Sequence, residues 1–165
     1  MSVRPIRLFG DPVLRSRTDE ILRIDDSIRA LVADLIDTVR EPGRAGVAAN
    51  QIGVGLRAFS FNIDGDVGYV LNPVLAAVDG EPELVEEGCL SVPGVAFPRS
   101  RHPWARVTGI DLDGAPVDIA GEGLLAQALQ HETDHLDGHL YFEGLVGSVK
   151  REAMRAIRQT EWFGR

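Results

Sequence analysis

Two histidines four residues apart, with a glutamate directly after the first, place the strongest constraint on the fold of this chain. At 3.6 residues per turn, His131 and His135 project about 40° apart on one helix face, close enough to bind a single divalent metal. Glu132 can reach a water on that metal and move its proton. Leu124 and Ala128 share the stripe of the histidines, so both histidines are expected on an apolar face, where they need partners that a metal would supply. The pattern predicts metal-assisted hydrolysis.

A catalytic site of this kind needs a third protein ligand, and the sequence offers three candidates. One class of metallopeptidases has a third histidine six positions after the second, where this chain has Tyr141. His139 follows Gly138, at which the helix is expected to end, and we expect it on the surface. The remaining candidate is Cys89, in the segment Glu-Glu-Gly-Cys-Leu-Ser. A Cys-His-His set would leave the fourth position for water.

The composition is typical of a globular protein, since 44% of the 165 residues are hydrophobic and 25% are charged. A chain of this length is expected to form one domain, residues 1–165, with its own core. Its one cysteine excludes an intramolecular disulfide. No apolar leader and no window of membrane-span length is present, so we expect a cytoplasmic protein without membrane contact. A net charge of −8 argues against general nucleic-acid binding.

The charge is unevenly distributed along the chain. Residues 148–165 hold five basic and two acidic side chains, a net charge of +3 that leaves −11 for the rest. Val149, Ala153 and Ile157 recur at helical spacing, so this segment is expected to form a basic C-terminal helix. The helix is either a docking element or a solvated face, and the residues alone favour neither.

Hydrophobic spacing predicts a single α+β domain with antiparallel β-sheets around the central helix. Residues 28–39 are expected to form an N-terminal amphipathic helix that ends at Pro42-Gly43. The helix that carries the His-Glu-x-x-His motif is expected over residues 123–137. Extended segments are expected at 56–63, 67–78, 83–87, 105–111 and 117–119. Asp-Gly pairs at 64–65, 79–80 and 113–114 predict hairpin turns.

Three separated motifs resemble those of one enzyme family. Residues 46–51 read Gly-Val-Ala-Ala-Asn-Gln, residues 87–91 read Glu-Gly-Cys-Leu-Ser, and residues 130–138 read Gln-His-Glu-Thr-Asp-His-Leu-Asp-Gly. In this order and at this spacing, over nearly the whole length, the chain resembles the peptide deformylases. That family removes the formyl group from the initiator methionine of nascent bacterial and organellar proteins and releases formate.

The resemblance implies a ligand set and a metal. Cys89, His131 and His135 would bind one metal ion per chain, and Glu132 would be the general acid/base for the metal-bound water that attacks the formyl carbon. Thiolate and imidazole ligands in tetrahedral geometry indicate zinc, and iron(II) is compatible with the same donors. The family implies Fe²⁺ as the native metal, with Ni²⁺ or Co²⁺ as active substitutes and Zn²⁺ as a weaker one.

The resemblance also implies how substrate is held. The side-chain amide of Gln51 and the backbone N–H of Leu90 would donate to the oxygen that becomes negative in the transition state, where fixed, uncharged donors are effective. Gly46 and Gly88 would let the peptide backbone lie against the protein as an added strand.

Two positions depart from the family pattern. The first motif usually opens Gly-x-Gly, and here Arg44 replaces the first of these glycines, at the edge of the expected cleft. An arginine there could pair with a peptide carboxylate. Gln127 lies one turn before His131, where the pocket for the methionine side chain is often apolar. The pocket is therefore expected to be slightly more polar in this chain, unless Gln127 points to solvent.

The expected partners are N-formylmethionyl nascent peptides and, through the basic helix over 148–165, the ribosome; the protein is expected to be a monomer. Two other functions fit parts of the pattern, namely a small metallopeptidase that cuts internal bonds and a non-catalytic, ribosome-associated metal-binding module. Cys89 argues against the first. Glu132 and Gln51 argue against the second, because a non-catalytic protein has no chemical need for either.

Overall fold

The structure, a computed structural model, describes residues 2–164 of the chain. The described part contains the α-helices α1 (Asp26–Val39), α2 (Gly123–Leu136) and α3 (Gly147–Arg158), and the short 3-10 helices η1 (Pro12–Arg15), η2 (Ala49–Ile52) and η3 (Tyr141–Gly144). Its strands are β1 (Gly46–Ala48), β2 (Ala58–Ile63), β3 (Asp66–Asp79), β4 (Glu83–Cys89), β5 (Val92–Arg101), β6 (Trp104–Ile110) and β7 (Pro116–Glu122).

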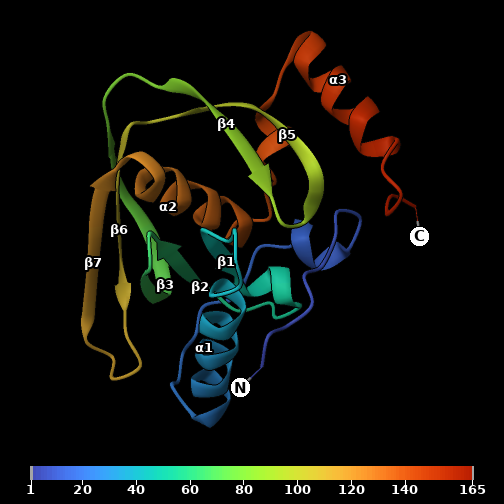
Figure 1. The fold of residues 1–165 in the computed structure, drawn as a ribbon. Helices are drawn as coiled ribbons and strands as arrows, with labels where there is room; N and C mark the ends of the chain where they lie inside the picture. Colours follow the sequence, from blue (N-terminus) through green and yellow to red (C-terminus); the bar gives the residue numbers. More distant parts are fainter. Residues whose placement is uncertain (1, 165) are drawn as a thin grey trace.

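The strands form two antiparallel sheets, and α2 lies between them (Figure 1). One sheet has five strands in the order β1-β2-β3-β6-β7, and β4 pairs only with β5. Helix α2 contacts all five strands of the larger sheet, while the β4–β5 hairpin covers its other side. The expected α+β domain with antiparallel sheets around a central helix is therefore confirmed.

Helix α1 forms as its sequence predicts. The Asp25 carboxylate accepts hydrogen bonds from the backbone N–H groups of Ser27 and Ile28, which caps the N-terminus. Leu35 and Val39 are fully buried on the face that packs against the sheet. The helix ends at Val39, with Arg40 as the C-cap, just before Pro42 and Gly43, as expected.

Helix α2 is buried because its apolar side chains pack onto the larger sheet. Ala126, Leu129 and Leu136 are fully buried in one cluster with Phe59 and other residues of the sheet. The helix ends at Leu136, and the chain then turns at Gly138, which has a φ of +83°. This burial holds the middle of α2 rigidly beneath the β4–β5 hairpin.

The sequence analysis did not predict two of the strands, β1 and β5. β1 has only three residues, too few for an alternating pattern, and β5 contains Pro93, Gly94 and Pro98, which are typical of turns. Proline is tolerated in β5 because this strand has a partner on one side only.

One predicted turn is wrong. The Asp-Gly pairs at 64–65 and 113–114 join β2 to β3 and β6 to β7 as expected. Asp79-Gly80 is not a hairpin, because Asp79 pairs with Trp104 and the chain leaves the large sheet at this point to form the β4–β5 hairpin. The Asp-Gly pair correctly indicates a turn, since Gly80 has a positive φ. It does not indicate which strand will pair with β3.

The C-terminal helix is shorter than expected. α3 ends at Arg158 instead of extending to the chain end, residues 159–164 form turns, and Arg165 lies outside the described residues. Ala153 and Ile157 are fully buried against β5 and η3, which leaves the basic side chains exposed. None of the helices within residues 2–164 is long and apolar enough to cross a membrane.

Candidate metal centre

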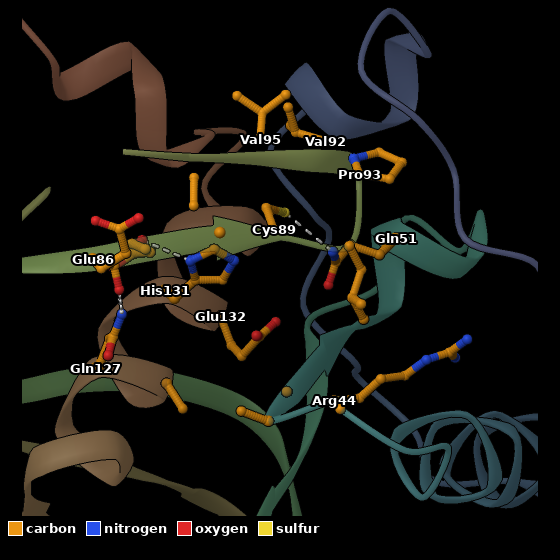
Figure 2. Close-up of a pocket in the computed structure, with 18 of the residues that line it drawn as sticks. Arg44, Gln51, Glu86, Cys89, Val92, Pro93, Val95, Gln127, His131 and Glu132 are labelled. Carbon is orange, nitrogen blue, oxygen red and sulfur yellow. Dashed lines mark hydrogen bonds and ion pairs between the residues drawn. The ribbon is translucent and has the colours of Figure 1, made fainter. Parts of the chain in front are cut away.

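Three donor atoms from two elements converge beside a cleft, and Figure 2 shows two of the residues that carry them, Cys89 and His131. Cys89 is the last residue of β4, and His131 and His135 lie one turn apart on α2. Sγ of Cys89 lies 3.2 Å from Nε2 of His135, which lies 3.0 Å from Nε2 of His131. The three donor atoms lie within 4.8 Å of one another. A thiolate and two imidazoles in this arrangement fit one divalent metal ion.

The second nitrogen of His131 contacts a buried carboxylate that the sequence analysis missed. Nδ1 of His131 lies 2.7 Å from Oε1 of Glu87, and the guanidinium of Arg101 lies 2.6 Å from the same oxygen. Arg101 also contacts Asp134 at 2.7 Å. A proton on Nδ1 leaves the lone pair of Nε2 directed at Cys89 and His135, as ligation requires.

Glu87 is a permanent negative charge in this network. It is 2% exposed and Arg101 is 5% exposed. Although burial alone would raise the pKa of Glu87, hydrogen bonds from Arg101 and His131 lower it to about 2. Period-2 alternation on β4 places Glu87 on the same face as Cys89, so the strand pattern contained this signal. No comparable local signal identifies Arg101, because its position depends on the pairing of β4 with β5.

The charges around the centre favour a bound cation. Although burial alone lowers the pKa of His131, hydrogen bonds to Cys89 and Glu87 raise it well above its usual value. Burial, followed by repulsion from His131, lowers the pKa of His135 well below its usual value, so this ring is neutral. The negative groups that stabilise a proton on His131 would equally stabilise a metal ion in its place.

Glu132 lies beside His131 and faces the cleft (Figure 2). It is 3% exposed, and its Oε2 has no hydrogen-bond partner among the described residues. The rest of the carboxylate lies against Gly46 of β1, where a Cβ atom would overlap it. Burial raises the pKa of Glu132 to about 7, with the charge of His131 opposing. A buried carboxylate of this kind is suited to accept and return a proton near neutral pH.

Gln51 lies in η2 with its side-chain orientation determined by its neighbours. The N–H of Ala48 donates to Oε1 at 3.0 Å, and because an N–H can only donate, the oxygen must face Ala48. The NH₂ group therefore faces the cleft, 3.1 Å from Oγ of Ser91 and 3.6 Å from Sγ of Cys89. Ser91 was not expected at the site, although it lies within one of the sequence motifs.

The remaining sequence-predicted residues line the same cleft, which has a volume of about 690 Å³. Leu90 lies in the tight turn between Cys89 and Val92, and Gly88 lies on β4 at the rim. A Cβ atom at Gly88 would meet Val95 and Ala96 at ordinary distances, so no intramolecular clash requires glycine there. The cleft therefore joins two of the three donors, Cys89 and His131, to the two predicted substrate-binding glycines, while His135 is buried behind it.

The two alternative third ligands lie elsewhere. Tyr141 is 1% exposed, and its hydroxyl donates to the carbonyl of Val95 at 3.0 Å. His139 is exposed, with its Nδ1 3.6 Å from Glu143, so the expectation of a surface histidine is confirmed. Neither belongs to the group of convergent donors.

The two departures from the family pattern have different surroundings. The guanidinium of Arg44 donates to the carbonyl of Thr38 at 2.9 Å, so its positive charge lies at the C-terminal end of α1. Gln127 does not simply point to solvent. Its NH₂ donates to the carbonyl of Glu86 at 3.2 Å and lies 3.4 Å from Oε2 of Glu87, so it joins α2 to β4 across the cleft wall (Figure 2).

Comparison with known proteins relates the chain to one family. Residues 3–151 match the family model described as polypeptide deformylase. A peptide deformylase of Parafrankia sp. is 50% identical over 163 residues, which cover 98% of this chain and 89% of the relative. The crystal structure of a peptide deformylase from Legionella pneumophila has a TM-score of 0.88 at 36% identity, covering 95% of this chain and 94% of that one. A second crystal structure, a peptide deformylase from Ehrlichia chaffeensis in complex with actinonin, has a TM-score of 0.87 at 33% identity, covering 98% and 99%.

Proposed function

Because the chain belongs to the polypeptide deformylase family and removes the N-formyl group from nascent peptides, we propose that Cys89, His131 and His135 hold the metal on which this family depends. The observation that carries this proposal is the convergence of the three donor atoms within 4.8 Å of one another. The Glu87 carboxylate, 2.7 Å from Nδ1 of His131, supports it by orienting that ring.

We assign iron(II) to the site, one ion per chain, with Ni²⁺, Co²⁺ or Zn²⁺ as substitutes. The single thiolate and two imidazoles are compatible with all four ions. When bound, such an ion lowers the pKa of a water molecule and polarises the formyl oxygen.

Glu132 is assigned the proton transfer. It accepts a proton from the water as the new C–O bond forms at the formyl carbon, and it returns this proton to the amide nitrogen as the C–N bond breaks. The products are formate and a peptide with a free amino terminus. The burial of Glu132 and the absence of a hydrogen-bond partner for its Oε2 among the described residues support this role.

Gln51 and the backbone N–H of Leu90 are assigned to the formyl oxygen. Ala48 holds the amide of Gln51 with its NH₂ toward Cys89 before substrate arrives. Such an amide costs little reorganisation when the oxygen becomes negative. Ser91, which accepts from the same NH₂ group, would keep one of its hydrogens occupied and leave the other for substrate.

Gly46 and Gly88 are assigned to the peptide backbone. Both line the cleft, Gly46 on β1 and Gly88 on β4, and both strands can offer backbone groups to an extended peptide. The methionine side chain would enter between α2 and β4. Gln127, held there by the Glu86 carbonyl, makes one side of that pocket polar.

One comparison of substrates tests the function. Formyl-Met-Ala should release formate from the iron-loaded protein under anaerobic conditions, and acetyl-Met-Ala should react at least a few hundredfold more slowly. A single methyl group is worth only about 1–3 kcal/mol in an accommodating pocket, so a larger ratio requires a rigid wall of ligands at the reacting carbon. Equal rates, or cleavage of casein and of the internal Met-Ala bond, would favour the metallopeptidase instead.

We also propose that the protein acts as a monomer in the cytoplasm and that α3 contacts the ribosome. The support is the exposed basic face of α3, which includes Lys150, Arg151, Arg155 and Arg158. Reversing Arg151 and Arg155 to Glu should weaken salt-sensitive cosedimentation with ribosomes. Reversing Arg23 and Arg40, which are also exposed, produces the same charge change elsewhere and is the matched control. Equal loss in both double variants would show that net charge, not α3, is responsible.

A further inference from the structure

One wall of the cleft is formed by a part of β5 that has left its partner strand. The pairing of β5 jumps from Val92 to Ala96 while the pairing on β4 advances by one residue. Residues 93–95, called the bulge below, therefore have no partner on β4. Gly94 at its centre has a φ of +80°. All three residues line the cleft, and Figure 2 shows Pro93 and Val95 there, so their position affects the width of the site.

Three donors from other parts of the chain bind alternate carbonyl groups of residues 91–95. They are the Phe9 amide to Ser91 at 2.8 Å, the Tyr141 hydroxyl to Val95 at 3.0 Å and the Trp162 indole to Pro93 at 3.0 Å. All three donors come from outside β4, so they take the place of a neighbouring strand along this part of β5. The bulge is thus held from behind.

The donor to Pro93 comes from the C-terminal tail, residues 159–164. Trp162 is half-buried against the apolar cluster beneath η3 and β5. Phe163 stacks on Phe9 at 6.1 Å, which anchors the tail at a second point. The tail lies beyond residues 3–151, which match the family model, so no role for it follows from family membership.

We propose that Trp162 is a positioning residue that fixes the bulge, and with it the cleft wall, for peptide binding. The inference rests on the proposed function, because the cleft must be the peptide site. The Pro93 carbonyl contacts Trp162 and no residue of β4. Without the indole N–H, the bulge would sample other positions, and a bound peptide would have to order it. The loss should therefore appear in substrate binding more than in the chemical step.

Trp162→Phe tests the contact, because it keeps an aromatic ring and removes the N–H. Hydrogen exchange should become faster in peptides that cover residues 92–97 and stay unchanged in α1. The melting temperature should fall by no more than about 4 °C, as expected for one hydrogen bond in a domain of this size. The control is Trp104→Phe, the same substitution at the other tryptophan of the chain, whose indole takes no part in holding the bulge.

Kinetics separate positioning from a purely structural role. KM for a formylated tripeptide should rise about fivefold in Trp162→Phe, with kcat changed less than twofold. The cost of ordering the bulge arises when the peptide binds, and it is the same in the bound ground state and in the transition state. In the Trp104→Phe protein, Trp162 is the sole tryptophan. The fluorescence of Trp162 should change when the slowly reacting acetyl-Met-Ala-Ser binds.

Each outcome decides the proposal. Unchanged exchange at 92–97, or an unchanged KM with an active wild type, overturns it. An equal fall in kcat and kcat/KM also overturns it, since that pattern means damage to the reaction centre. If wild-type protein releases no formate, the proposed function fails, yet the exchange measurement still shows whether Trp162 holds the bulge.

Discussion

Glu87 and His131 are joined by a 2.7 Å contact between Oε1 and Nδ1, deep beneath the β4–β5 hairpin. The contact links the strand that ends at Cys89 to the helix that carries the other two donors. Arg101 binds the same carboxylate, so its charge is shared between a cation and an imidazole. The orientation of the candidate metal centre therefore depends on a residue that does not belong to it.

Glu87→Gln tests this dependence. The amide retains the shape but loses the charge, and the buried guanidinium of Arg101 then keeps its contact to Asp134 alone among the described carboxylates. We expect metal affinity to fall about 10–100-fold, the usual effect of losing such a supporting contact. Stability should fall by about 1–3 kcal/mol, as for other buried hydrogen bonds to charged groups. Chelator competition with Ni²⁺ and thermal melts measure the two effects.

The matched control is Glu86→Gln, the same chemical change one residue away on the exposed face of β4. It should leave metal affinity and melting temperature unchanged. Equal affinities in the two variants would mean that Glu87 does not orient His131.

Glu132→Gln separates proton transfer from metal binding. The substitution is nearly isosteric and leaves all three donors in place, so the protein should bind one metal ion per chain. Turnover of formyl-Met-Ala should fall by about two or more orders of magnitude, the scale of general acid–base catalysis. Elemental analysis and a formate assay on the same preparation measure both quantities. Near-normal turnover in fully loaded protein would remove Glu132 from the mechanism.

Features that depend on residues close together in the sequence could be predicted, and features that depend on residues far apart in the sequence could not. α1 and α2 are set by spacing within one or two turns, and the six-residue segment around His131 contains most of the candidate centre. Glu87 lies in a motif beside Cys89 and could have been found from strand alternation. Arg101 and Trp162 could not, because their contacts depend on pairing across a sheet and on a tail 69 residues from Pro93.

The wrong hairpin at Asp79-Gly80 has the same origin. A turn signal reports the local dihedral angles, and the choice of partner strand is made by burial elsewhere in the chain. The end of β3 pairs with β6 instead of β4, and residues 80–103 connect these two strands. Local patterns therefore predicted most elements, missed β1 and β5, made the C-terminal helix too long and misassigned one connection.

Asp34 should make stability depend on pH at a point far from the cleft. Its carboxylate accepts from the N–H of Ser2 and from Arg4, each at 2.8 Å. Although burial alone would raise the pKa of Asp34, these contacts lower it below its usual value. A lowered folded pKa means that the stabilisation is present above the unfolded pKa of about 3.8 and is lost as pH falls through the folded value. Urea unfolding should show Asp34→Asn destabilised at pH 7 and closer to wild type at pH 3.

Asp37→Asn, one turn later in α1, is the control for that comparison and should show a smaller difference at pH 7. If the difference in unfolding free energy between wild type and Asp34→Asn were the same at pH 7 and pH 3, the lowered pKa of Asp34 would be contradicted.

Gly46 and Gly88 are both expected to contact substrate, but their surroundings predict different responses to alanine. At Gly46 a Cβ would overlap the Glu132 side chain, and at Gly88 it would make ordinary contacts only. Neither glycine has a positive φ, so alanine is compatible with the backbone at both positions. Gly46→Ala should therefore displace Glu132 and lower kcat by at least about tenfold, since even small misplacement of a catalytic group is costly. Gly88→Ala should keep kcat and raise KM, because the added methyl group meets only the incoming peptide. The reverse pattern, with kcat lost at Gly88 and kept at Gly46, would mean that Glu132 is not held against β1 during turnover.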